Sequence, residues 1–145
     1  MFCSSESNFD KCNIVDFESF KKTINHFISL GGIEEISFSG GEPMLHPNIY
    51  DMVEFCSNLG IKTTLYTSGI VSRTEQLQSE NKYIQKILNQ FGNFRDISID
   101  EFKRIESCGL SKVVFDLQAS EVDEYNELMG TKNNMPLLLK TILHT

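Results

Sequence analysis

Two kinds of residue in this sequence have the chemistry for a functional site: cysteine thiols, and polar groups in glycine-rich turns. Thiolates bind soft metal ions and iron–sulfur clusters. The four cysteines are spaced by 9, 44 and 52 residues, however, which matches no zinc pattern of the Cys-x-x-Cys type. As a set they do not form a complete metal site. They are Cys3, Cys12, Cys56 and Cys108.

The turn Ser39-Gly40-Gly41-Glu42-Pro43 carries the sharpest local signal. Two glycines let a ligand approach the backbone closely, and the Glu42 carboxylate is suited to a cationic group such as an amino group. Pro43 fixes the exit from the turn. The G-x-G-x-x-G fingerprint and the P-loop pattern are both absent. Taken alone, the motif is equally compatible with a Gly-Pro turn whose glutamate is solvated.

Two more polar segments follow strand-like runs: Thr67-Ser68-Gly69, and Asp116-Leu117-Gln118-Ala119-Ser120. Parallel strands bring their carboxyl ends to one edge of a sheet, where ligands gather. We therefore expect all three segments on one rim. A Thr-Ser-Gly turn can also satisfy only its own backbone. Asp116 and Gln118 are alternative contacts, and we expect only one of them to face a ligand.

Apolar periodicity predicts the elements that position these turns. Residues 71–97 are polar and predict an elongated connection with a short helix around residues 82–89. Ser98 and Glu101 form the pattern of a capping box at a helix start. The expected helices cover residues 16–30, 49–59 and 98–108, with two more beginning near 121 and 135; the expected strands cover 35–39, 61–66 and 112–117.

This alternation of strands and helices is typical of an α/β fold with parallel strands and right-handed crossovers. The 145 residues fit one such unit, with no tandem repeat or linker. A hydrophobic content of 40% argues against disorder. Every apolar run is shorter than the roughly 18–20 residues of a membrane span.

The net charge and the start of the sequence limit the binding partners and the cell compartment that we expect. The net charge of −7 lacks the basic footprint of a nucleic-acid-binding protein. No export signal is visible at the start of the sequence, so we expect a cytoplasmic protein with reduced thiols. We expect neither a membrane nor a nucleic acid as a partner.

The turn and its surroundings resemble the GGEP segment of radical S-adenosylmethionine (radical SAM) enzymes. The resemblance runs in family order, from the turn at 38–47 through the strand ends at 60–69 and 113–118 to a Tyr-to-Gly-Thr stretch at 124–131. It implies a TIM-barrel-like (β/α)6 core of parallel strands. About four of the six strands would be present in this chain, and residues 1–145 would form one radical SAM core domain, truncated at both ends.

The resemblance also implies the cofactors. Family members use a 4Fe–4S cluster to cleave S-adenosylmethionine reductively, which yields a 5′-deoxyadenosyl radical that abstracts hydrogen from a substrate. A reductant such as ferredoxin or flavodoxin would be a partner, and the substrate would be a peptide or a small molecule. The residues implied to bind S-adenosylmethionine are Phe2, Gly40, Gly41, Glu42, Pro43, Ser68, Asp116 and Gln118.

The sequence departs from the family pattern at the cysteines that would bind the cluster. The family motif, C-x-x-x-C-x-aromatic-C, is represented only by its last part, Met1-Phe2-Cys3. Cys3 is therefore the implied metal ligand, and the other two cysteines would lie upstream of Met1. This chain alone would then be inactive. Cys56 and Cys108 fall on apolar helix faces and are expected in the core. The alternative is a fold remnant without a cluster that acts as a binding or scaffold protein.

Overall fold

The structure is a computed structural model and describes residues 14–72, 94–129 and 134–145. A three-stranded parallel sheet lies at its centre, in the order β1-β2-β5. The central strand β2 pairs with β1 from Glu35↔Lys62 onward and with β5 from Thr64↔Lys112 onward. The strands are β1 (Glu35–Phe38), β2 (Lys62–Thr67) and β5 (Lys112–Phe115), so each strand predicted from the sequence is confirmed.

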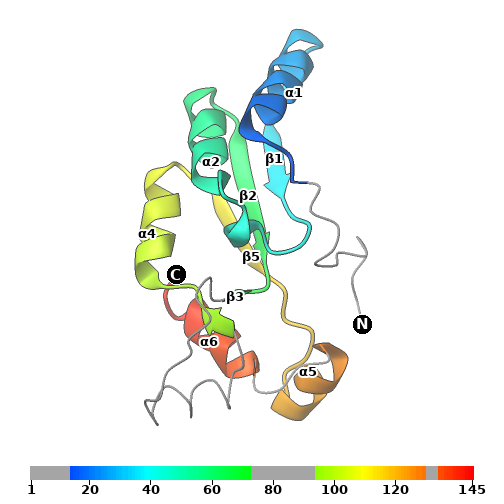
Figure 1. The fold of residues 1–145 in the computed structure, drawn as a ribbon, viewed down its shortest axis with the longest axis vertical. Helices are drawn as coiled ribbons and strands as arrows, with labels where there is room; N and C mark the ends of the chain where they lie inside the picture. Colours follow the sequence, from blue (N-terminus) through cyan, green and yellow to red (C-terminus); the bar gives the residue numbers. More distant parts are fainter. Residues whose placement is uncertain (1–13, 73–93, 130–133) are drawn as a thin grey trace.

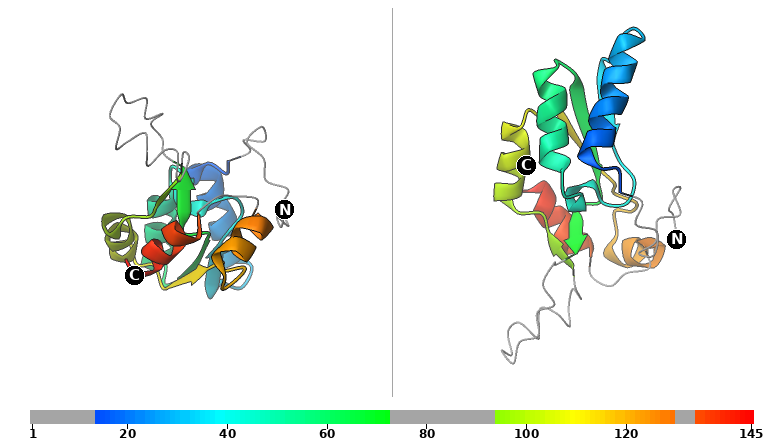
Figure 2. Two further views of the ribbon diagram at one scale, coloured as in Figure 1. Left: turned by 90° about the horizontal axis from the view of Figure 1, so that it is seen from below. Right: turned by 45° about the horizontal axis from the view of Figure 1, so that its top comes forward.

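Three helices lie side by side along one face of this sheet (Figures 1 and 2). They are α1 (Phe17–Ser29), α2 (Ile49–Asn58) and α4 (Ile99–Ser107). Each buries an apolar stripe at helical spacing against the sheet, as amphipathic helices do. The cores beneath them are formed by Met44, Ile49, Val53, Leu65, Val71, Ile97, Phe102 and Ile105, and by Ile24, Cys56 and Ile61.

The far end of α1 departs from its predicted apolar face. Ile24 is buried, but Phe27 and Ile28 are 50% and 39% exposed. A helix of 13 residues is about 20 Å long, whereas a strand of four residues spans about 13 Å. The last turn of α1 therefore extends past the start of β1, as Figure 1 shows, which leaves Phe27 and Ile28 partly exposed.

A second, antiparallel pair of strands lies beyond the end toward which the parallel strands point (Figure 1). Strand β3 (Ile70–Ser72) pairs with β4 (Phe94–Asp96). The last two residues of β3 and all of β4 fall inside residues 71–97, which we predicted as an elongated connection with a short helix, so the strands at both ends of that stretch were not predicted. Strands of three residues are too short to show a period of two. The helix predicted at 82–89 lies outside the described residues.

Helices α5 (Val122–Met129) and α6 (Met135–Ile142) complete this end of the molecule. Both were predicted to begin within one residue of their observed starts. They enclose a separate apolar cluster with β3, formed by Ile70, Tyr125, Met135, Leu137 and Leu138. Phe115, at the end of β5, packs against this cluster and against the main core, so it joins the two.

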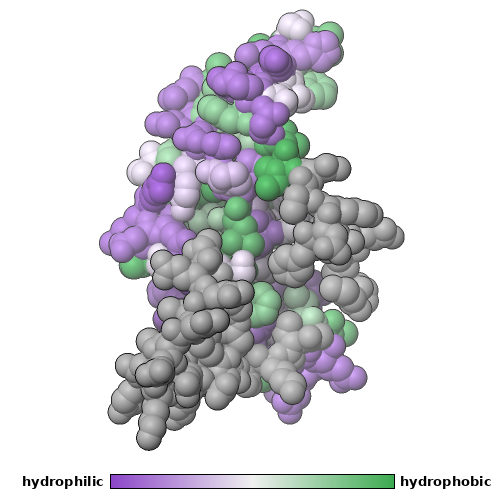
Figure 3. All heavy atoms as spheres, in the orientation of Figure 1, coloured by the Kyte–Doolittle hydropathy of each residue, from purple (hydrophilic) through white to green (hydrophobic). Residues whose placement is uncertain are grey.

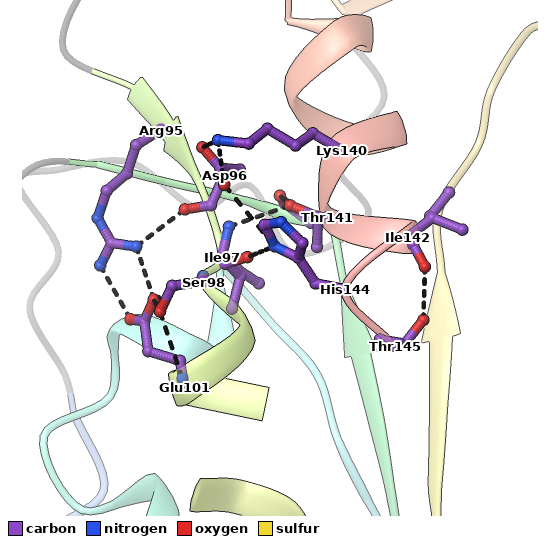
Figure 4. A network of polar contacts seen from close by, with 11 residues as sticks. Arg95, Asp96, Ile97, Ser98, Glu101, Lys140, Thr141, Ile142, His144 and Thr145 are labelled. Atoms are coloured by element: carbon purple, nitrogen blue, oxygen red, sulfur yellow. Dashed lines mark hydrogen bonds and ion pairs between the residues drawn. The ribbon is translucent and has the colours of Figure 1, made fainter. Parts of the chain in front are cut away.

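Polar contacts fix β4 to the helices on either side of it (Figure 4). The Arg95 guanidinium donates to both carboxylate oxygens of Glu101, at 2.7 and 2.9 Å. Glu101 also closes the predicted capping box with Ser98. On the other side, Lys140 of α6 forms an ion pair with Asp96 at 3.0 Å. The Arg95 contact lowers the pKa of Glu101 to about 2, despite the opposing effect of partial burial.

The outer surfaces of α1, α2 and α4 carry mostly hydrophilic side chains (Figure 3). Within the described residues, no helix combines the length and the apolar character needed to cross a membrane. The same residues contain three parallel strands, where the sequence led us to expect about four.

Candidate functional site

The three polar segments predicted to share a rim do meet at the carboxyl ends of the parallel strands. Glu42, in the turn after β1, reaches the end of β2. Its carboxylate accepts hydrogen bonds from the Thr67 hydroxyl at 2.7 Å, and from the Ser68 hydroxyl and N–H at 2.6 and 2.9 Å. The third segment joins through the backbone, because Asp116 N–H donates to the Thr67 carbonyl at 3.1 Å.

The Glu42 carboxylate is saturated by these contacts. Met44 N–H donates to Oε1 at 3.1 Å, which caps a short 3₁₀ turn, η1 (Pro43–Leu45). Each carboxylate oxygen thus accepts two hydrogen bonds, and a carboxylate has about four acceptor sites in all. We expected this group to be available to a cationic ligand. The structure instead uses it to bind two strand ends together.

The backbone of the two glycines is the open part of the turn. No hydrogen bond engages the N–H or carbonyl of Gly40 or Gly41 within the described parts of the chain. Both residues are exposed, and a Cβ atom at either would meet no atom of the described residues within 4 Å. Gly40 has a φ of 121°, which L side chains rarely adopt. Backbone donors and acceptors that no described residue uses are therefore exposed at this turn.

Asp116 and Gln118 are exposed, and their side chains contact each other through a hydrogen bond from the Gln118 amide to the Asp116 carboxylate. We expected only one of them to face a ligand. Because the chain leaves the strand after Phe115, the alternation of side chains along a strand no longer separates the two. They form a joint polar pair beside the end of β2.

Helix α6 packs against the turn after β2 and forms a hydrogen bond with it. The buried Thr141 hydroxyl donates to the Gly69 carbonyl at 2.6 Å and accepts from Ile97 N–H at 3.0 Å. Gly69 has a φ of 70°, and a Cβ atom there would lie 2.6 Å from Leu138 Cδ1. The positive φ favours glycine at this position, and an added Cβ would have to displace the Leu138 methyl group. The contacts with Thr141 and Glu42 hold the turn that carries Ser68.

Tyr125 places one more polar group near this rim. Its side chain is fully buried, and its hydroxyl has no hydrogen-bond partner among the described residues. Burial raises the pKa of Tyr125, and the negative charge of Asp116 adds to the effect. An unpaired buried hydroxyl costs about 1–3 kcal/mol, and no described residue offsets this cost at Tyr125.

The described cysteines are core thiols, as predicted for Cys56 and Cys108. Cys56 is fully buried, and this burial raises its pKa to about 11. Cys108 is half-buried against the core, which also raises its pKa. Protonated thiols are poor metal ligands. The described residues hold no group of three or more side chains suited to a metal ion. Cys3, Phe2 and Cys12 lie outside them.

One groove in the described part of the chain lies away from this rim. It measures about 410 Å³ and runs between α4 and the free edge of β5, with Phe102, Lys112 and His144 among its lining residues. It contains none of the predicted site residues. A parallel sheet binds ligands at the carboxyl ends of its strands, so we place the site at the rim and not in this groove.

Sequence reasoning missed the internal contacts of the site. Thr67 was weighed as a ligand contact or as part of a self-contained turn, and its side chain instead bonds Glu42 across 25 positions of the sequence. The role of Thr141, whose bond to Gly69 crosses 72 positions, had no local signal at all. Only the type of residue at each strand end was visible beforehand.

The fold and the rim place this chain among parallel α/β proteins, which bind their ligands at the carboxyl ends of the strands. The sequence profile of the Radical SAM superfamily matches residues 1–143. The chain belongs to this superfamily, which confirms the resemblance inferred from the sequence.

Curated relatives carry several enzyme names. The chain is 30% identical over 86 residues to the antilisterial bacteriocin subtilosin biosynthesis protein AlbA of Bacillus subtilis (strain 168), covering 59% of the chain and 19% of the relative. It is 22% identical over 136 residues to the PqqA peptide cyclase of Methylobacterium sp. (strain 4-46), covering 93% and 29%. An S-adenosylmethionine-dependent nucleotide dehydratase of Selenomonas ruminantium is 30% identical over 63 residues, covering 43% and 23%. The chain thus spans less than a third of these relatives.

Proposed function

We propose that this chain is the cofactor-binding core of a radical SAM enzyme that acts on a peptide. Membership of the superfamily supports radical SAM chemistry. The observation that carries the proposal is the arrangement of the glycine-rich turn at the carboxyl ends of the strands. Glu42 joins two strand ends and leaves the backbone of Gly40 and Gly41 open. Two of the relatives above are named for work on a bacteriocin and on a peptide, which favours a peptide substrate over a small molecule.

The described residues fit the amino-acid end and the ribose of S-adenosylmethionine. An ammonium group needs acceptors, and the carbonyl oxygens of Gly40 and Gly41 would supply them while Glu42 and Pro43 hold the turn in shape. Ribose hydroxyls need both donors and acceptors, which Ser68, Asp116 and Gln118 provide. These assignments extend the sequence-based expectation, with one change: Glu42 acts through the turn and not through direct contact.

The cluster belongs to the residues that precede the described part of the chain. We propose that Cys3 is one thiolate ligand and that Phe2 lies beside the adenine ring. When bound, a 4Fe–4S cluster and S-adenosylmethionine supply a 5′-deoxyadenosyl radical that removes hydrogen from the substrate. A one-electron donor such as ferredoxin or flavodoxin would serve this site. An iron–sulfur protein with reduced thiols suits the cytoplasm.

We also propose that residues 1–145 are one core domain of a longer enzyme and are inactive alone. The comparison with relatives supports this, because the chain matches only 19–29% of the three described above. The alternative proposal is a fold remnant that binds a partner without catalysis. The two differ in whether the full-length protein cleaves S-adenosylmethionine.

The test is a reductive cleavage assay. Full-length protein, reconstituted with iron and sulfide without oxygen, is mixed with S-adenosylmethionine and dithionite, and 5′-deoxyadenosine is measured by chromatography. We expect 5′-deoxyadenosine from the wild type and none from Cys3→Ala. If the wild type binds a cluster but yields no 5′-deoxyadenosine, the proposed activity is wrong; if it binds no cluster, the scaffold alternative holds.

A further inference from the structure

The parallel sheet has a second face, opposite α1, α2 and α4. Side chains alternate between the two faces of a strand. Ile36, Leu65 and Val113 belong to the cores beneath the helices or pack against them, so their neighbours along each strand point the other way. We call these neighbours the open face; they are Glu35, Ser37, Lys62, Thr64, Tyr66, Lys112 and Val114.

The composition of the open face argues against an apolar covering layer. Strands of a parallel sheet that has helices on both faces are apolar almost throughout, whereas Val114 is the one aliphatic residue of the open face. No described helix covers this face, because α5 and α6 lie beyond the carboxyl ends of the strands (Figure 1). Burial of charged groups without partners is costly. The open face is therefore suited to a polar ligand.

The charged groups of the open face favour a negatively charged ligand. The Glu35 carboxylate is already engaged, because it accepts a hydrogen bond from the buried Thr64 hydroxyl at 2.7 Å. Lys62 and Lys112 are exposed and form no hydrogen bond or ion pair with any described residue. Lys112 also borders the groove beside α4, since it lies on the edge strand β5. Two free ammonium groups beside one carboxylate leave this face positive, although the chain carries −7 overall.

Tyr66 connects the open face to the glycine-rich rim. It lies on the central strand β2, is 46% exposed, and makes no hydrogen bond through its hydroxyl within the described residues. Ser68 follows two residues later, which is about 7 Å along the strand. Gly41 follows β1 and Asp116 follows β5, one on each side of β2. A ligand held between Gly41 and Asp116 would therefore lie across the end of β2, close to the Tyr66 ring.

We propose that the open face binds the peptide substrate, with Tyr66 beside the residue that reacts and Lys112 paired with an acidic side chain of the peptide. The inference rests on the proposed function, which assigns the ribose of S-adenosylmethionine to Ser68 and Asp116. Lys112 is level with Thr64 in the sheet register, four residues before Ser68, or about 13 Å along the strand. An extended peptide spans this distance in about four residues, so the acidic side chain lies about four positions from the reacting residue.

The test measures peptide binding to the full-length protein by fluorescence polarisation, without S-adenosylmethionine. The probes are fluorescein-labelled nonapeptides of serine and alanine with a central tyrosine and either glutamate or lysine four positions away. We expect the glutamate peptide to bind about fivefold more tightly, because an exposed ion pair replaces a repulsion. Lys112→Glu should reverse this preference. Lys103→Glu is the matched control and should keep it, because Lys103 is equally exposed and unpaired among the described residues but lies on α4.

Two further variants test the contact at Tyr66 and the openness of the face. Tyr66→Ala should weaken both peptides several-fold and leave the preference for glutamate unchanged, because the ring contacts the central tyrosine and carries no charge. Ser37→Cys places a thiol at an exposed position of the open face. Its reaction with a maleimide, followed by peptide mass spectrometry, should be fast in the full-length protein and slow down when the glutamate peptide is added.

The outcomes separate this inference from the proposed function. Equal binding of the two peptides, binding of neither, or an unchanged preference in Lys112→Glu would overturn the assignment of the open face. A thiol in Ser37→Cys that is unreactive without peptide would also overturn it, because another segment of the full-length protein would then cover the face. None of these measurements needs a cluster. A protein that binds the peptides as expected but forms no 5′-deoxyadenosine would keep the open face as a peptide site and lose the radical chemistry.

Discussion

Glu42 and Ser68 lie 26 positions apart, yet the Ser68 hydroxyl and N–H both donate to the same oxygen of Glu42. This contact joins the turn after β1 to the end of β2. A carboxylate at the start of a turn would ordinarily be solvated, and here its acceptor sites are all engaged by the protein. The glycine-rich turn is therefore shaped before any ligand binds.

Loss of this anchor should cost stability. Glu42→Gln replaces one carboxylate oxygen by an amide NH₂, which cannot accept hydrogen bonds. We expect the free energy of unfolding to fall by about 1–3 kcal/mol, because partly buried donors lose their acceptor. Urea unfolding measures the change. Glu34→Gln is the control, because that side chain is exposed and forms no hydrogen bond or ion pair with the described residues; equal stability of the two variants would contradict the anchoring role.

Gly41 offers a test of ligand approach without a change in the fold. No atom of the described residues lies within 4 Å of its missing Cβ, so Gly41→Val should unfold at the same urea concentration as the wild type. The valine side chain would project where a ligand must approach the backbone. We expect the affinity for S-adenosylmethionine, measured by calorimetry in the reconstituted full-length protein, to fall at least about tenfold, or about 1.4 kcal/mol. Unchanged affinity would move the amino-group site elsewhere.

The turn after β2 should be sensitive to one added methyl group. Gly69→Ala combines a positive φ with a steric clash against Leu138, and overpacking of a core costs about 1–3 kcal/mol. Gly60→Ala is the matched control, with a φ of 72° and nothing within 4 Å of its Cβ. Thermal unfolding should show a clearly larger loss for Gly69→Ala. Similar losses would mean that Leu138 moves aside freely.

Thr141 should matter through its hydroxyl alone. Thr141→Val keeps the shape of the side chain but leaves the Gly69 carbonyl and Ile97 N–H without their shared partner. Unsatisfied buried groups cost about 1–3 kcal/mol each. Thr23→Val, at an exposed position of α1, should change the unfolding free energy far less. A Thr141→Val protein as stable as the Thr23→Val protein would show that water replaces the hydroxyl.

The ion pair of Arg95 and Glu101 predicts a pH dependence. The pKa of Glu101 falls from 4.5 to about 2 on folding. A lowered pKa stabilises the folded state fully above 4.5, and this stabilisation is lost as the pH falls toward 2. We expect the wild type to lose about 1–2 kcal/mol more than Glu101→Gln between pH 6 and 3, a discounted value because both side chains are partly exposed. Parallel losses in urea titrations would contradict this.

The predictable part of the fold was the part with local periodicity. Ile24 and Ile105 lie on apolar stripes that recur over several helical turns. Ser98 and Glu101 form a capping-box pattern that predicts a helix start from four residues alone. The strand pair β3–β4 was not predicted, because each strand has only three residues and its partner is distant in the sequence. Such pairing depends on contacts that no short window of sequence contains.

The candidate site also has a part that could be predicted from the sequence and a part that could not. Glycine and acidic residues at strand ends were visible in the sequence, and the structure brings all three segments together. The engagement of Glu42 by Thr67 and Ser68 was not visible, because it depends on how two loops meet in space. The joint orientation of Asp116 and Gln118 was missed because the strand ends before them.

The central claim is that Cys3 helps to bind a 4Fe–4S cluster that S-adenosylmethionine contacts. Its most direct test is electron paramagnetic resonance of the reduced, reconstituted full-length protein, recorded with and without S-adenosylmethionine, together with its iron content. We predict about four irons per chain for this site and a spectrum that S-adenosylmethionine changes, in the wild type and in Cys108→Ser. Cys3→Ala should lose both. A Cys3→Ala protein that keeps its iron and its response to S-adenosylmethionine would contradict the account.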